Sequence, residues 1–422
     1  MDDRIGVPLE LDGFEVASSE VLDGVMEVRV RSTRRPHCHH CGSVSVMGHG
    51  RNERRIRDRA CVYPTVLRWS QRRFLCRDCG RTCRERHPEL AGRRAVTNRF
   101  RRCLFERTIV QPFAHVAAAE TVTLHRVMDA FESLAIEELP SEPVFAPEVL
   151  SIDESAFRRR FHFHTVISDP VRRRVLELLD GRKTADVAGW LRGLPPQVSG
   201  GIRTVTMDLF WPYRRAVEQA LPAARIVADK FHVLRAVTEA AQRVRRRFGR
   251  LHRHRRIGRE GGTDRRRHPA NDPEVFRMRW VFAKRSNRLS EDEREWLERV
   301  FARSEPELRA AWWIKEAFAA IYEALDRAEA ERRLDVWIGN LDAGGLTEFT
   351  NTWRTLQHWR EQILAYFDHR VTNAFAEGIT NKIKVLKRSA YGFRSAERYR
   401  TKVLLATGHR RSNGSSTHRL SR

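Results

Sequence analysis

The chain of 422 residues is longer than one hydrophobic core usually organises, so roughly two to four domains are expected. It carries 79 Lys and Arg against 54 Asp and Glu, a net charge of +25, while 41% of its residues are hydrophobic and include 21 Phe and 10 Trp. This composition excludes a wholly disordered basic protein and indicates a polyanionic partner.

Neither a membrane span nor a signal peptide is visible in the sequence. No run of about eighteen apolar residues occurs, and the first residues, MDDRIGVPLELDG, carry acidic charge. The 7 Cys are an odd number that includes two CxxC pairs, which favours reduced thiols and metal ligation over a disulfide framework. We therefore expect a cytoplasmic protein.

The positive charge is concentrated in three segments. Residues 29–102 hold 21 basic and 5 acidic residues, residues 243–267 hold 12 and 2, and residues 382–422 hold 12 and 1. A single such run is as often a solvated face as a binding surface. Three separate patches on an otherwise acidic chain favour a long nucleic-acid footprint with several phosphate contacts.

Two segments of alternating apolar and β-branched residues, 8–32 and 62–75, predict short strands next to two cysteine pairs. Brought together by strands, the pairs CHHCG and CRDCG would place four thiolates around one Zn²⁺, as in a zinc ribbon. The alternative is unrelated buried thiols. The expected zinc ligands in this module, residues 1–90, are Cys38, Cys41, Cys76 and Cys79. Alternative ligands are His37, His39, His40, Cys61 and Cys83, whereas Cys103 is expected in a core. The arginines expected to contact DNA are Arg51, Arg54, Arg55, Arg72 and Arg73.

Residues 91–140 are predicted to be helical, with a helix-turn-helix candidate over 112–132 and VTLHRVMDAF as its recognition helix. Its turn lacks the usual Gly, so an ordinary helical pair is an equal alternative. The Pro-rich segment 139–150 predicts a linker. Five strand-like segments follow, with helical segments between the last three. These strands are 148–157, 160–170, 173–181, 201–210 and 224–233, and the helices are 184–194 and 211–222. This order indicates an α/β layer with a mixed sheet.

Residues 233–370 contain no convincing strand and predict amphipathic helices rich in Trp. We expect these Trp to pack in the core rather than to stack on nucleotides. They are Trp280, Trp296, Trp312, Trp313, Trp337, Trp353 and Trp359. Within this region, 255–273 predicts a mobile basic loop. Residues 371–407 are expected to complete the preceding domain, and 408–422 to form a disordered basic tail.

Asp153 and Asp208 each follow an apolar strand-like run, PEVLSI and GIRTVTM. Carboxylates at the ends of neighbouring strands can hold two divalent metals for phosphodiester chemistry, although a lone Asp there is often only a cap. Glu377 is a third candidate, because Asn381, Lys384 and Arg388 recur on the same helical face. This helix is expected to contact DNA through Asn381, Lys382, Lys384, Lys387 and Arg388; the alternative is a solvated, ion-paired helix. Asp229 and His232 form a D-x-x-H that is either accessory to the site or a structural turn.

With these residues in place, the chain resembles the IS L-three family of bacterial insertion-sequence transposases over nearly its whole length. The similar blocks are HGRNERRIRDR between the cysteine pairs, SIDESAF, TMDLFWPYRRAVEQALPAARIVADKFHV and EGITNKIKVLKRSAYGFR. The resemblance implies an α/β ribonuclease H-like catalytic domain with a large all-α insertion, preceded by the zinc-ribbon β module and the helical DNA-binding segment. The domain would comprise residues 148–232 and 371–407, separated by the insertion 233–370.

The resemblance also implies a DDE triad of Asp153, Asp208 and Glu377 that binds Mg²⁺ or Mn²⁺, in addition to the Zn²⁺ of the cysteine module. Asp229 and His232 would be accessory, with Asp229 the rival of Asp208 for the second position. The implied function is a nucleoid-associated bacterial DNA transposase, a dimer or larger on DNA, that binds terminal inverted repeats and catalyses hydrolysis and strand transfer. Its alternatives are a non-catalytic DNA-binding regulator and a nuclease without strand transfer.

Overall fold

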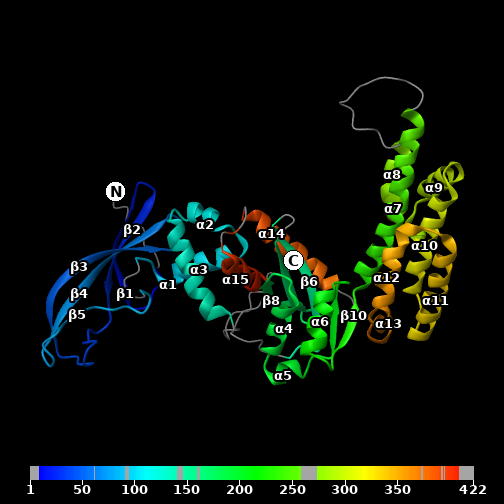
Figure 1. The fold of residues 1–422 in the computed structure, drawn as a ribbon. Helices are drawn as coiled ribbons and strands as arrows, with labels where there is room; N and C mark the ends of the chain where they lie inside the picture. The colour runs from blue at the N-terminus through cyan, green and yellow to red at the C-terminus, as the bar shows by residue number, and fades with distance from the viewer. Residues whose placement is uncertain are drawn as a thin grey trace. The chain divides into compact units, whose positions relative to one another are not determined.

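The computed structural model describes residues 9–60, 62–90, 95–139, 146–158, 162–257, 273–371, 374–390, 393 and 395–407. The chain divides into two compact units: unit 1 comprises 1–140 and 385–422, and unit 2 comprises 141–384 (Figure 1). Cys61, half of the predicted linker, most of the predicted basic loop, and the predicted tail lie outside the described residues. Among the helices that the structure describes, none combines the length and apolar character needed to cross a bilayer.

Unit 1 begins with a five-stranded sheet in the order β1-β2-β4-β3, with β5 paired to β4. The strands predicted before each cysteine pair are present, and a further long strand, β3, lies between the pairs. Leu67 and Trp69 of β4 pack with Val28 and Ile56 in the core of the sheet. The strands are β1 (Phe14–Leu22), β2 (Val25–Ser32), β3 (Val46–Asp58), β4 (Thr65–Cys76) and β5 (Thr82–Arg84).

The predicted helical segment forms α1 (Asn98–Val110), α2 (Phe113–Ala119) and α3 (Leu124–Glu138). The side chains of Thr97 and Thr123 accept backbone hydrogen bonds at the N-termini of α1 and α3, which fixes where these helices begin. The α2–α3 pair covers the helix-turn-helix candidate. Helix α15 (Ala396–Ala406) packs against α1 and α3, where its Leu405 joins their apolar cluster.

Lys402 of α15 is fully buried inside unit 1. Its ammonium donates a hydrogen bond of 2.7 Å to the carbonyl of Gln111 and lies 5.0 Å from the centre of the Phe113 ring. Burial lowers the pKa of Lys402 to about 8. The folded state therefore releases this proton at a lower pH than the unfolded chain does.

We expect the contribution of Lys402 to the free energy of unfolding to rise between pH 8 and pH 10.5. In this window the unfolded chain binds more protons, so increasing pH favours the folded state, by on the order of 3 kcal/mol in total. Urea denaturation of wild type and Lys402→Met at pH 7 and pH 10.5 measures this. The free energy of unfolding of Lys402→Met minus that of wild type should be lower by about 3 kcal/mol at pH 10.5 than at pH 7. An equal difference at both pH values would contradict the prediction.

Unit 2 contains a second five-stranded sheet in the order β10-β9-β6-β7-β8. The three strands β6, β9 and β10 are parallel to one another, whereas β7 and β8 are antiparallel to their neighbours. The predicted mixed sheet and its element order are confirmed, with a short additional helix α5. The elements are β6 (Val149–Arg158), β7 (His162–Asp169), β8 (Arg174–Asp180), α4 (Thr184–Arg192), α5 (Pro196–Ser199), β9 (Thr204–Met207), α6 (Trp211–Ala220) and β10 (Arg225–Ala228).

Residues 230–369, here called the helical region, contain no strand in their described parts, as predicted. Trp312, Trp337 and Trp359 are buried. The expectation of core packing is wrong for Trp280 and Trp313, which are 68% and 55% exposed. The elements are α7 (Lys230–Ile257), α8 (Pro273–Ala283), η1 (Ser286–Arg288), α9 (Glu291–Arg303), α10 (Pro306–Ile321), α11 (Arg327–Gly344), η2 (Thr347–Phe349), α12 (Thr350–His358) and α13 (Arg360–His369).

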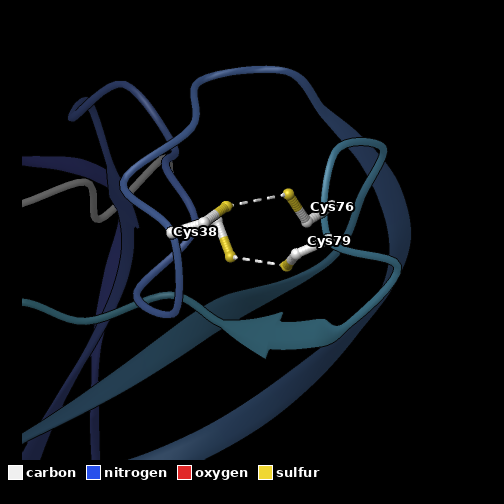
Figure 2. Close-up of side chains that lie close together, drawn as sticks. Cys38, Cys76 and Cys79 are labelled. Carbon is white, nitrogen blue, oxygen red and sulfur yellow. Dashed lines mark hydrogen bonds between the residues drawn. The ribbon is translucent and has the colours of Figure 1, made fainter.

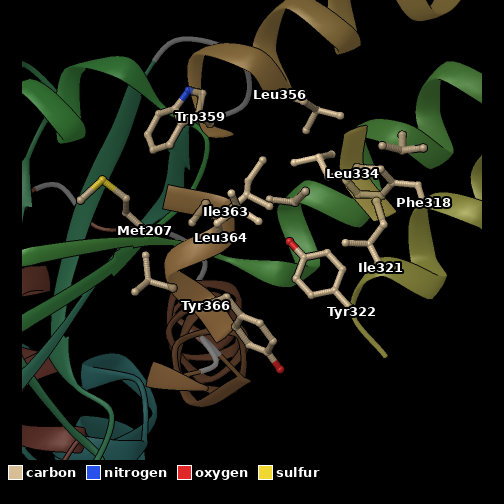
Figure 3. Close-up of a cluster of buried hydrophobic side chains, with 14 of the residues drawn as sticks. Met207, Phe318, Ile321, Tyr322, Leu334, Leu356, Trp359, Ile363, Leu364 and Tyr366 are labelled. Carbon is tan, nitrogen blue, oxygen red and sulfur yellow. The ribbon is translucent and has the colours of Figure 1, made fainter. Parts of the chain in front are cut away.

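One continuous apolar core joins the helical region to the sheet of unit 2. Figure 3 shows Ile363 and Leu364 of α13 between Met207 of β9 and the helical cluster around Phe318 and Tyr322. Burying such side chains contributes about 1.5–3 kcal/mol each. The helical region is therefore packed onto the sheet rather than tethered to it by a linker. Helix α14 (Ala374–Ser389) follows α13 and returns the chain to the sheet edge.

Candidate metal centres and catalytic pocket

The two cysteine pairs meet in unit 1. The Sγ atoms of Cys38 and Cys79 lie 3.7 Å apart, those of Cys41 and Cys76 lie 3.6 Å apart, and all four lie within 4.8 Å of one another. Figure 2 shows the sulfur atoms of Cys38, Cys76 and Cys79 pointing toward one another from the two turns. The structure thus brings together all four residues expected as zinc ligands.

Both turns owe their shape to a glycine. Gly42 and Gly80 have φ angles of 76° and 64°, a left-handed conformation that favours glycine. Their N–H groups donate to the carbonyls of Cys38 and Cys76 at 2.9 and 3.0 Å. These bonds close each C-x-x-C-G turn so that its two thiols face the same side.

The sulfur geometry fits a tetrahedral zinc ion. With Zn–S bonds of about 2.3 Å, tetrahedral ligands lie roughly 3.8 Å apart, close to the two short distances observed. The N–H of His40 donates to Sγ of Cys38, and this bond, acting against burial, lowers the pKa of Cys38 to about 6, so that it readily forms a thiolate. Cys83 lies outside the four-sulfur group, with its Sγ 3.9 Å from the carbonyl of His37.

A second group of candidate ligands lies on three neighbouring parallel strands in unit 2. Asp208 and Asp229 directly follow β9 and β10, but the expected strand end is wrong for Asp153, because β6 continues to Arg158 through its pairing with β7. In the register of the sheet, Ile152 pairs with Met207, and Met207 pairs with Ala228. The residues that directly follow Ile152, Met207 and Ala228 in the sequence are Asp153, Asp208 and Asp229. Because equivalent positions of neighbouring strands point to the same face, this register places three carboxylates side by side.

His232, in the first turn of α7, lies between two of these acids. Its Nδ1 is 2.8 Å from an oxygen of Asp229 and 2.8 Å from an oxygen of Asp208. Burial lowers the pKa of His232, but the two carboxylates outweigh it and raise the pKa to about 10. Burial raises the pKa of Asp208 to about 6, against the opposing effect of His232. Ligand atoms of Asp153, Asp208 and His232 lie within 4.8 Å of one another.

Asp153 is fixed from two sides. Its Oδ1 accepts the N–H of Glu154 at 2.7 Å, and its Oδ2 accepts the hydroxyl of Thr380 at 2.6 Å. Thr380 belongs to α14, so this bond places α14 at the carboxylate cluster. Glu377 lies in the first turn of α14, but its side chain lies outside the described residues.

These acids line a pocket of about 820 Å³ whose lining also includes basic and apolar side chains. Glu154 is a further acid of the lining and is paired with Arg182 at 2.6 Å. Phe231 and Leu234 contribute aromatic and apolar surface. The basic and amide side chains that line it are Lys230, Arg235, Arg285, Arg288, Asn381 and Lys384.

The arginines expected to contact DNA in unit 1 have different surroundings. Arg55 pairs with the buried Glu27, and Arg72 pairs with the buried Glu85, so both are engaged within the sheet. Arg54 lies 5.8 Å from the centre of the Trp69 ring. Arg51 is exposed on β3, whereas Arg73 on β4 is half-buried.

On α14 the predicted polar stripe is present. Asn381, Lys384 and Arg388 are exposed, while Ile379 and Ile383 are buried on the neighbouring face. Lys382 is also exposed, and burial lowers the pKa of Lys387. Asn381 and Lys384 reach the catalytic pocket.

Sequence reasoning missed several pocket residues. Nothing in the sequence marked Thr380, Lys230, Arg285 or Arg288, because their proximity to the acids arises only from the packing of the helical region and α14. The alternation of hydrophobic residues locates an element but does not reveal which distant element it meets.

Two family models match the chain. A model described as a transposase matches residues 150–403, and a model described as the zinc-finger of transposase IS204/IS1001/IS1096/IS1165 matches residues 34–79. The chain is 26% identical over 378 residues to the transposase for insertion sequence element IS1001 of Bordetella parapertussis, covering 87% of this chain and 88% of the relative. It is 25% identical over 276 residues to the transposase for insertion sequence element IS1557 of Mycobacterium tuberculosis, covering 62% and 60%. The chain belongs to the IS L-three family of insertion-sequence transposases.

Proposed function

We propose that the protein binds the terminal inverted repeats of an insertion sequence and catalyses metal-dependent phosphodiester hydrolysis followed by strand transfer. The observation that carries this proposal is the alignment of Asp153 and Asp208 at equivalent positions along the adjacent parallel strands β6 and β9, inside a pocket that basic side chains also line. Carboxylates placed side by side repel one another unless cations are bound between them.

The strand arrangement supports a ribonuclease H-like catalytic domain. Three antiparallel strands, β6 to β8, are followed by the parallel strands β9 and β10 on the other side of β6. This places the first acid on the central strand and the second on its neighbour. Residues that follow the carboxyl ends of parallel strands gather at one edge of the sheet, where a substrate can reach them.

Asp208 is the better supported of the two rivals for the second position of the triad. Asp208, and not Asp229, shares the group of close ligand atoms with Asp153. Asp229 is 4% exposed and holds Nδ1 of His232, which suits a positioning role. Glu377 is proposed as the third acid because its position on α14 is one helical turn before Thr380, which touches Asp153.

The donor set fits hard divalent cations such as Mg²⁺ or Mn²⁺, which prefer carboxylate oxygens. The Oδ1 atom of Asp208 is buried and lies 2.8 Å from Nδ1 of His232. When bound, a pair of such cations supplies activation of the attacking oxygen and stabilisation of the leaving oxygen. Asp153, held by Thr380 and the Glu154 N–H, keeps its oxygens oriented, and the basic side chains hold the DNA strand.

The zinc module of residues 1–90 is proposed to provide end recognition together with the helical pair α2–α3. The zinc module carries basic residues that can contact phosphates, and α3 is a helix that can enter a DNA groove. Because two transposon ends must be joined to one target, we propose that the protein acts as a dimer or a larger assembly on DNA.

Incubation of the purified protein with Mg²⁺ and DNA carrying labelled inverted-repeat ends tests this function. We expect cleavage that frees a 3′-hydroxyl at the end of the element, and joined products when target DNA is added. A non-catalytic regulator would retard the labelled DNA in a gel without cutting it. A nuclease would cut but give no joined product, which would limit the function to hydrolysis.

A further inference from the structure

Several basic side chains of the catalytic pocket come from the helical region. Arg285 and Arg288 lie in and next to the short η1 turn between α8 and α9, and Lys230 is the first residue of α7. All three line the pocket that contains Asp153 and Asp208. The helical region therefore contributes directly to the pocket, with Arg285 and Arg288 more than fifty positions beyond Asp229 in the sequence.

A network of buried charged side chains stabilises the η1 turn. Glu316, which is 6% exposed, accepts the N–H of Ser286 at 2.8 Å and pairs with the buried Lys315 at 2.9 Å. Arg285 contacts the same carboxylate at 3.5 Å and Glu323 at 2.7 Å. A turn fixed in this way presents its side chains in a defined direction, which lowers the entropy lost when they bind a ligand.

Two of these three cationic side chains, those of Lys230 and Arg288, have no anionic partner in the part of the chain that the structure describes. Lys230 is half-buried, with its Nζ 5.1 Å from the Tyr322 ring centre and 5.6 Å from that of Tyr366, and it forms no ion pair there. The guanidinium of Arg288 is exposed and forms no ion pair or hydrogen bond with the described residues. Positive groups gathered without counter-charges favour an anion between them.

We infer that Lys230, Arg285 and Arg288 form a phosphate subsite, in which the helical region holds a backbone phosphate of the DNA strand being cut, in the same pocket as the carboxylates. This inference rests on the proposed function. The carboxylates and these three cationic side chains then bind successive parts of one strand, so that the cationic side chains align the scissile phosphodiester. Lys230, Arg285 and Arg288 act as positioning residues, since contacts to phosphates orient DNA without reading its sequence.

Arg288 gives the clearest test, because its guanidinium forms no ion pair or hydrogen bond with the described residues that its replacement would break. We compare full-length wild type with Arg288→Gln, which removes the charge, and Arg288→Lys, which keeps it. Arg294→Gln is the matched control, since Arg294 is an exposed arginine of α9 that does not line the pocket. The readouts are the rate of Mg²⁺-dependent cleavage of a labelled repeat end and, without Mg²⁺, the dependence of end binding on salt.

We expect Arg288→Gln to cut roughly 10- to 100-fold more slowly, as for the loss of one charge-assisted hydrogen bond. Its slope of log binding constant against log salt should fall by about 0.9, the value for one phosphate contact. Arg288→Lys should keep the slope and recover most of the rate, and Arg294→Gln should match wild type. The subsite is overturned if Arg288→Gln has the rate and slope of Arg294→Gln. Failure of wild type to cut would instead overturn the proposed function, while the salt slopes still decide the subsite.

Discussion

Asp153→Asn and Asp208→Asn are each expected to slow cleavage of repeat ends by at least about 1,000-fold. Asn has nearly the same shape as Asp, so its amide oxygen can still accept the Glu154 N–H, while its NH2 group can donate to the Thr380 hydroxyl oxygen in place of the bond that Asp153 accepts. What is lost is the negative charge that holds a divalent cation. Cleavage of labelled ends at saturating protein measures the effect.

Binding of the same ends should remain intact in both variants, because removing a negative charge from the pocket does not oppose the approach of DNA. Asp292→Asn is the matched control, since Asp292 is an exposed acid in the first turn of α9, away from the pocket. Either pocket variant that still nicks DNA with Mg²⁺ at the wild-type rate would be removed from the triad. Asp229→Asn, tested in parallel, should reduce the rate by less than Asp208→Asn does.

Cys76→Ser is expected to lower the zinc content well below one ion per chain and to unfold the zinc module. Structural zinc sites contribute about 10–16 kcal/mol of binding free energy to small domains, and this energy is available only when all ligands are present. The core under the site is small, with Cys38, Phe74 and Cys83 packed around Cys76. Elemental analysis and gel retardation of labelled ends measure the loss of zinc and of end binding.

Two further cysteine variants make this experiment decisive. Cys103→Ser alters a half-buried thiol on α1 that lies outside the four-sulfur group, and it should retain full zinc and end binding. Cys83→Ser should also retain zinc. Loss of zinc from Cys83→Ser but not from Cys76→Ser would mean that the fourth ligand had been assigned to the wrong cysteine.

Much of the fold could be predicted because its elements carry local signals. β9 and β10 are short apolar runs between helical segments, so their order along the chain was clear. β3 was harder to recognise, because both of its faces carry charge: Arg55 meets Glu27 on one side and Arg54 lies over Trp69 on the other. The exposure of Trp280 and Trp313 could not be predicted either, since Trp density indicates a core but does not fix the rotation of each helix.

The candidate site likewise contains residues that local sequence patterns predict and residues that they do not. Asp153 and Asp208 were recognised because each follows an apolar strand-like run, and the cysteine pairs because their spacing is local. That the two acids share one register depends on strand pairing, which no local pattern specifies. Thr380 and Arg288 join the pocket through contacts with residues far away in the chain, and such contacts leave no trace in the sequence around them.

The hydrogen bond between Thr380 and Asp153 joins residues 227 positions apart. During synthesis, the ribosome must therefore release the cysteine module, the sheet and every helix up to α14 before that bond can form. A polypeptide terminated early, inside the helical region, would keep its basic amino-terminal part yet lack a finished pocket. With the proposed end recognition by the amino-terminal part, such fragments would occupy transposon ends without cutting them, and would compete with the complete protein.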